Sequence, residues 1–111
     1  MQDNARLDTF VLLQRPLVMR ALRRSSIRKK IAKHLFDISP NGNYVSDIAY
    51  NIKTTPTNVI GALRGMNNRY REEESLLQLN IVEEVTGGKN IKLYRITDFG
   101  RDVIENLENR K

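Results

Sequence analysis

The most regular feature of the sequence is a set of side chains that recur every three or four positions after Ser25. Serine often caps a helix, and helical spacing places the following residues on one face: Ile27, Ile31, His34, Leu35 and Ile38. The pattern therefore predicts a helix that ends before Pro40, because proline disfavours helical backbone in the residue that precedes it.

Two shorter helices are predicted next, after a very short strand at Tyr44 and Val45. Ser46 is expected to cap the first of them, Asp47 to Ile52, with a buried side formed by Val45, Ile48, Ala49 and Ile52. A tight turn at 53–54 follows. Thr55 is then expected to cap a helix over about 56–66, whose inward residues are Val59, Leu63 and Met66.

The last third of the chain predicts a hairpin and a final helix. A polar linker at 67–74 and a helical turn that ends at Asn80 lead into strands at 81–85 and 91–96, joined by a turn at Gly87 and Gly88. Asparagine tolerates the left-handed backbone with which such a turn often ends. Thr97 is expected to cap the final helix, with apolar positions at Phe99, Val103 and Leu107.

This order of elements is typical of the winged helix-turn-helix, a mainly α fold with a small antiparallel β-hairpin (α+β). The 111 residues suffice for one compact core. We assign residues 25–111 to the winged helix-turn-helix domain and residues 1–24 to an N-terminal helical extension. The apolar residues of this extension either lie on the domain's own core or form a dimer surface.

Charge is distributed unevenly along the chain, whose net charge is +6. Residues 1–35 hold nine Lys and Arg against two Asp and Glu, whereas residues 70–111 hold seven against nine. A basic surplus favours a polyanion partner, because each cation placed on a phosphate releases a counterion. Composition alone leaves DNA, RNA and an anionic membrane surface open.

Several classes of site and location are disfavoured by what the sequence lacks. There is no cysteine, which excludes disulfides and thiolate metal sites. No apolar run approaches the roughly 18 residues that span a membrane, and the N-terminus has no signal-peptide pattern. We therefore expect a cytoplasmic protein without metal, cofactor or membrane segment.

The predicted helix at 56–66 carries the residues best suited to read DNA. Opposite its inward side lie Thr57, Gly61, Arg64 and Asn68, with Asn58 at the flank. Arg64 has the donors to read guanine, and Asn58 has the amide to read adenine. Gly61 would permit close approach of the duplex. Thr55 and Thr57 lie at the helix N-terminus, where a phosphate is favoured.

Each of these assignments has a structural alternative. Thr55 caps its helix whether or not DNA is present, and Asn58 and Arg64 could simply be solvated. The glycines at 61 and 65 could instead permit close packing within the protein.

The hairpin tip at 86–92 and the basic helix after Ser25 supply further cations. As a wing, the tip would place Lys89 and Lys92 on the DNA backbone or over the minor groove. From the basic cluster between 20 and 33, we take Arg28 and Lys29 as phosphate contacts. The alternatives are an ordinary surface hairpin and a solvated helix face.

Three stretches together resemble the small archaeal winged helix-turn-helix transcriptional regulators, related to the MarR-like and ArsR-like superfamily. They are SSIRKKIAKHLFDI, YVSDIAYNIKTTPTNVIGALRGM and LLQLNIVEEVTGGKNIKLYRITDFGRDVI, which span residues 25–104. The resemblance implies that the third helix and the wing hold double-stranded DNA and that the protein acts as a homodimer. Two departures are Asn80, where a glycine is frequent, and the longer linker at 67–74, whose run of glutamates adds negative charge near the expected DNA face.

An enzyme is not expected. His34 is the only histidine, and its spacing places it on the core side of its helix. The glutamates at 72–74 are consecutive and would diverge, and no phosphate loop or catalytic triad pattern is present. The rival function is a winged-helix module that binds protein or RNA within a larger complex.

Overall fold

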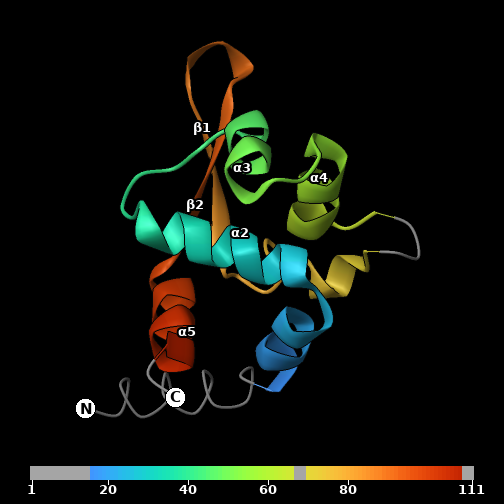
Figure 1. Cartoon of the computed structure of the whole chain (residues 1–111). Coiled ribbons are helices and arrows are strands. Elements are labelled where there is room, and N and C mark those ends of the chain that lie inside the picture. Colours follow the sequence, from blue (N-terminus) through green and yellow to red (C-terminus); the bar gives the residue numbers. More distant parts are fainter. Residues whose placement is uncertain (1–15, 67–69, 109–111) are drawn as a thin grey trace.

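The computed structural model describes residues 16–66 and 70–108, which are mainly helical with a two-stranded antiparallel hairpin (Figure 1). The predicted α+β fold class is therefore confirmed, and the architecture is winged-helix-like. Residues 16–24 are helical, and the elements that follow are α2 (Ser26–Asp37), α3 (Val45–Ile52), α4 (Pro56–Arg64), η1 (Glu72–Glu74), β1 (Val82–Thr86), η2 (Gly88–Asn90), β2 (Lys92–Ile96) and α5 (Asp98–Glu108).

Helix α2 lies at the centre of the fold, with α3 and α4 on one side and α5 on the other (Figure 1). Its Ile31 and Leu35 are fully buried. Around them pack apolar side chains from α3, α4, α5 and the hairpin, and from the turn before β1, including Ile48, Val59, Leu63, Leu76, Ile81, Tyr94 and Val103. The core consists of aliphatic residues with two tyrosines, in accord with the scarcity of aromatic residues in the sequence.

The helical segment 16–24 belongs to this same core. Val18, Ala21 and Leu22 are at most 1% exposed. Of the two roles predicted for the N-terminal extension, contact with the domain's own core is therefore the one observed for these residues. The earlier apolar residues of the extension, Leu7 and Phe10 among them, lie outside the described residues.

Three of the four predicted helix caps are confirmed. The side chains of Ser25 and Thr55 accept hydrogen bonds from the backbone N–H three residues later, at 3.2 Å in both cases. Thr97 does the same for α5, at 2.9 Å. The prediction for Ser46 is wrong, because α3 begins one residue before it and has Tyr44 as an N-cap without a side-chain hydrogen bond.

The strand predicted at Tyr44 and Val45 is also absent, since Val45 already starts α3. The chain instead makes a single β-bridge one residue earlier. Asn43 donates its N–H to the carbonyl of Tyr94 and accepts the N–H of Tyr94, both at 2.9 Å. This bridge joins the start of the helix pair to strand β2.

Helix α4 is two residues shorter than predicted. It ends at Arg64 because Gly65 adopts a φ of 90°, which interrupts the helix and is accessible to glycine. Met66 was predicted on the inward side of this helix. It lies beyond the end of the helix, where it is half-buried against the core and forms a bridge with Tyr70.

The hairpin pairs Val82 with Ile96 and Thr86 with Lys92, and each strand begins one residue later than predicted. Tyr94 and Ile96 are buried, whereas Lys92 on the same face is exposed because the hairpin extends beyond the core (Figure 1). Asn80 has the predicted left-handed backbone. At the tip, however, positive φ falls on Lys89 and Asn90 and not on the two glycines.

Candidate nucleic-acid interface

Helix α4 has a buried side and an exposed side, as an interface helix requires. Thr55 caps it, Pro56 occupies its first turn, and Val59, Ala62 and Leu63 are fully buried against the core. The exposed residues form what we call the α4 outer face: Pro56, Thr57, Ile60 and Arg64. The predicted site residue Thr57 lies on this face, and so does Arg64.

Gly61 does not lie on the α4 outer face, contrary to the prediction. It is buried, and a Cβ added at this position would lie 2.5 Å from Cδ2 of Tyr70. The Met66–Tyr70 bridge brings the tyrosine ring over this side of α4. Gly61 is thus a close-packing position within the protein, which is the alternative that the sequence left open. The exposed side of α4 is rotated away from it, toward Ile60.

Asn58 is half-buried and engaged within the protein. Its Nδ2 donates to the Thr54 hydroxyl at 3.0 Å, and its Oδ1 accepts from the Tyr70 hydroxyl at 3.5 Å. These bonds hold the amide between the helix pair and Tyr70, so its assignment as a base-reading residue is not supported. Thr55 is exposed beside it and serves as the cap. Asn68 lies outside the described residues.

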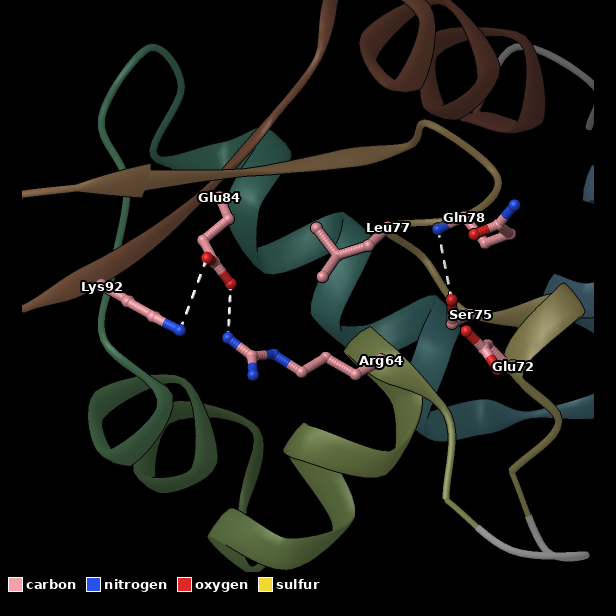
Figure 2. Close-up of a pocket in the computed structure, with 7 residues that line it drawn as sticks. All are labelled: Arg64, Glu72, Ser75, Leu77, Gln78, Glu84 and Lys92. Atoms are coloured by element: carbon pink, nitrogen blue, oxygen red, sulfur yellow. Dashed lines mark hydrogen bonds and ion pairs between the residues drawn. The ribbon is translucent and has the colours of Figure 1, made fainter.

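Arg64 is linked to the hairpin by a charged network (Figure 2). Its Nη2 lies 2.5 Å from Oε2 of Glu84 and 2.7 Å from the Tyr94 hydroxyl, which itself donates to Glu84 at 3.0 Å. On the other side of the carboxylate, Nζ of Lys92 lies 3.7 Å from Oε1 of Glu84. The network orients Arg64 through Nη2. Its remaining N–H groups can donate to a ligand, because a guanidinium carries five donors.

The network also shifts the protonation equilibria of its members. The hydrogen bond from Tyr94 lowers the pKa of the Glu84 carboxyl, and Arg64 and Lys92 lower it further. Burial raises the pKa of the Tyr94 hydroxyl, and the hydrogen bond to Tyr94 raises the pKa of the Arg64 guanidinium. Glu84 therefore carries a full negative charge at neutral pH, next to the α4 outer face.

The sequence prediction missed Glu84. The signal was present in the strand alternation, because residues that pair across an antiparallel hairpin share a face, and Glu84 pairs with Tyr94. The hairpin register needed to align the two residues could not be read to a single position from the sequence.

The hairpin tip presents the predicted wing cations. Lys89 is exposed where the chain turns, with a φ of 61°. Lys92 is exposed on the first residue of β2, and its contact with Glu84 is too long and too exposed to hold it strongly. Lys92 lines the same hollow as Ile60 and Arg64 of the α4 outer face.

The two cations predicted on α2 differ in their surroundings. Lys29 is exposed. The side chain of Arg28 is only 3% exposed, lies 3.4 Å from the Glu74 carboxylate and stacks over the Tyr70 ring at 5.8 Å. This burial does not support Arg28 as a phosphate contact, because Tyr70 and Glu74 cover the side chain at the start of α2.

A hollow of about 500 Å³ lies between the start of α3, α4 and strand β2. Its apolar lining includes Tyr44, Ile60 and Tyr94, with Arg64 and Lys92 among its polar residues. Ile60 was missed by the sequence prediction, since its position relative to Leu63 also fits the inward stripe of an amphipathic helix.

Within residues 16–66 and 70–108, no three His, Cys, Asp or Glu side chains are grouped to hold a metal ion. Among the same residues, no helix is long and apolar enough to cross a membrane. His34 is half-buried, and its Nε2 lies 3.1 Å from the side-chain amide of Asn43.

Comparison with known proteins identifies relatives over most of the chain. A family model described as EarA-like matches residues 18–107. An uncharacterized protein of the archaeon Methanocaldococcus jannaschii is 40% identical over 95 residues, which cover 86% of this chain and 85% of that protein. No solved structure matches. Neither match names the MarR-like or ArsR-like groups, and the family match includes the α4 outer face and the hairpin together.

Proposed function

The chain belongs to the EarA-like family, and we propose that it is a sequence-specific double-stranded DNA-binding regulator of transcription. The proposal extends the resemblance to small archaeal winged helix-turn-helix regulators. Helix α4 would enter the major groove, and the hairpin tip at 86–92 would lie on the backbone or over the minor groove.

One observation carries this proposal: α4 keeps an exposed outer face, next to a hairpin with exposed lysines. Thr57, Ile60 and Arg64 on this face are exposed, although the opposite side of the same helix is fully buried. A helix of this diameter fits the major groove, which is about 12 Å wide. Lys89 and Lys92 extend the cationic surface beyond the helix.

The contacts differ in kind along this surface. Arg64 would read a guanine edge with the donors that Glu84 and Tyr94 leave unused. Thr57 lies near the capped N-terminus of α4, where backbone N–H groups and the helix dipole favour a phosphate. Lys89 and Lys92 would contact phosphates, which position the protein without reading sequence.

Binding to duplex DNA is expected to weaken steeply with salt. Each phosphate contact releases a counterion, so the logarithm of the binding constant should fall linearly with the logarithm of salt concentration, with a slope of about −0.9 per contact. The test is selection of the full chain on random duplexes, followed by fluorescence anisotropy at several salt concentrations. If the chain binds no duplex, or if its affinity for DNA does not change with salt concentration, the proposal is contradicted and the rival protein- or RNA-binding module is favoured.

A pair of matched variants locates the binding surface. Lys89→Ala should weaken all duplexes alike and reduce the magnitude of the salt slope by about 1. Arg101→Ala is the control, because Arg101 lies on α5, and Figure 1 shows α5 and the hairpin tip at opposite ends of the molecule. Equal losses for the two variants would show that binding depends on overall charge and not on the wing.

We also propose that the protein binds DNA as a homodimer, with recognition helices about 34 Å apart on half-sites one turn apart. The candidate surfaces for this contact are Leu7 to Leu22 and Phe99 to Leu107, since both carry more apolar side chains than so small a core should need. Val18, Leu22, Val103 and Ile104 are occupied in the core of their own subunit. Leu17, which is 58% exposed, and the half-buried Phe99 and Leu107 remain for a partner.

The dimer is tested by light scattering at the concentrations used for DNA binding. We expect the mass of two chains for the full-length protein, and a shift toward one chain for Leu17→Lys, since a charge would be placed in the contact. A mass of one chain for the unaltered protein under these conditions would exclude the homodimer.

A further inference from the structure

Ile60 is an exposed apolar residue at the middle of a face that is otherwise suited to a charged ligand. It is 39% exposed, and it follows Thr57 by one helical turn and precedes Arg64 by another. It also lines the hollow between α4 and β2, together with the exposed ring of Tyr44. Thr57 and Arg64 on the α4 outer face would contact a phosphate and a polar base edge, so the apolar side chain of Ile60 requires a different partner.

The charges around the hollow indicate which partner this is. Arg64 and Lys92 belong to its lining and share the single Glu84 carboxylate, and Lys89 directly precedes Asn90, which also lines the hollow. Cations around an apolar centre complement a polyanion that carries a small apolar group. In the major groove of DNA the apolar group is the 5-methyl group of thymine, since the other base edges present polar donors and acceptors.

We infer that Ile60 determines specificity by packing against the 5-methyl group of a thymine, in a site that the hollow leaves open. The inference rests on the proposed function, because it requires α4 in the major groove. It adds a base preference that hydrogen bonding from Arg64 and Thr57 does not supply. It also separates DNA from RNA, because uracil lacks the methyl group.

Removal of single methyl groups from the DNA tests this inference. In a duplex obtained by selection, each thymine is replaced in turn by deoxyuridine, which keeps the base pair and deletes the methyl group. We expect about fourfold weaker binding at one or two positions per half-site, the loss that corresponds to one buried methyl group. The remaining replacements should leave affinity unchanged.

The variant Ile60→Ala should bind the thymine and deoxyuridine duplexes equally, because it has lost the side chain that contacts the methyl group. Alanine is a strong helix former, so α4 is preserved, and urea unfolding verifies this. The matched control is Ile91→Ala, since Ile91 is 44% exposed but is not part of the hollow lining. This control should retain the discrimination between the two duplexes.

The results that would overturn the inference differ from those that would overturn the function. If the unaltered chain binds no duplex, both fail. If it binds a selected duplex but tolerates deoxyuridine at every position, only the role of Ile60 fails. The same holds if Ile60→Ala still discriminates between the duplexes, because the methyl group is then recognised elsewhere, or if selection yields sites without a preferred thymine.

Discussion

Replacement of Glu74 by alanine is expected to lower the free energy of unfolding by about 3 kcal/mol, because it leaves Arg28 as an uncompensated buried charge. The Arg28 guanidinium is 3% exposed and lies 3.4 Å from the Glu74 carboxylate. Its other contacts are a long hydrogen bond to the carbonyl of Ala21 and the Tyr70 ring. Its Nε is buried without a hydrogen-bond partner among the described residues. Equilibrium unfolding in urea measures the loss.

The neighbouring Glu73 provides the control, since it belongs to the same short η1 helix but is exposed. Glu73→Ala should change the free energy of unfolding by less than about 0.5 kcal/mol. Introducing Arg28→Met together with Glu74→Ala should recover most of the stability, because an apolar side chain removes the buried charge itself. If the two glutamate variants are equally stable, the buried pair does not support the fold in this way.

Gly100→Ala is expected to lower the free energy of unfolding by about 3 kcal/mol or to prevent folding, because the first turn of α5 has no space for a side chain. An added Cβ would overlap the carbonyl oxygen of Ile81 and lie 2.8 Å from Cγ1 of Ile96. Displacement of the Ile81 carbonyl would break a hydrogen bond. This carbonyl accepts the backbone N–H of Thr97 at 3.0 Å, and the Thr97 side chain bonds to the preceding carbonyl of Asn80 at 2.6 Å.

Gly88→Ala is the matched control for this substitution. A Cβ at Gly88 has no atom within 4 Å among the described residues, so the midpoint of urea unfolding should stay close to that of the unaltered chain. A stable Gly100→Ala protein with an unchanged midpoint would show that α5 can move away from the 80–81 turn at little cost. The packing described for this end of the molecule would then be wrong.

The local signals for the fold were readable from the sequence because they act over three or four residues. Ser25, Thr55 and Thr97 are helix caps in the structure as predicted, since a short hydroxyl side chain reaches the N–H three positions later. The same rule wrongly predicted Ser46 as the cap of α3. The helix begins earlier, at Val45, with Tyr44 as its N-cap next to the bridge at Asn43.

The candidate site was only partly predictable. Thr57 and Arg64 lie on the α4 outer face as expected, and Lys89 and Lys92 lie on the hairpin. Periodicity could not show that Gly61 is buried, because the exposure of a helix side depends on what packs against it. Here the side is covered by Tyr70, which lies nine residues later in the chain. Ile60 was missed, since an apolar residue three positions before Leu63 also fits the inward side of the helix.

By itself, therefore, the sequence determined the order of the helices and the hairpin, three of the four helix caps and the positive charge of the chain. Tertiary structure alone decided which cations are available, because contacts between residues 46 positions apart bury Arg28 against Glu74. It also decided that Arg64 is held by Glu84 and that Ile60 faces outward. The physical reason is that helical periodicity specifies directions around one axis, whereas exposure depends on the distant segments that pack against that axis.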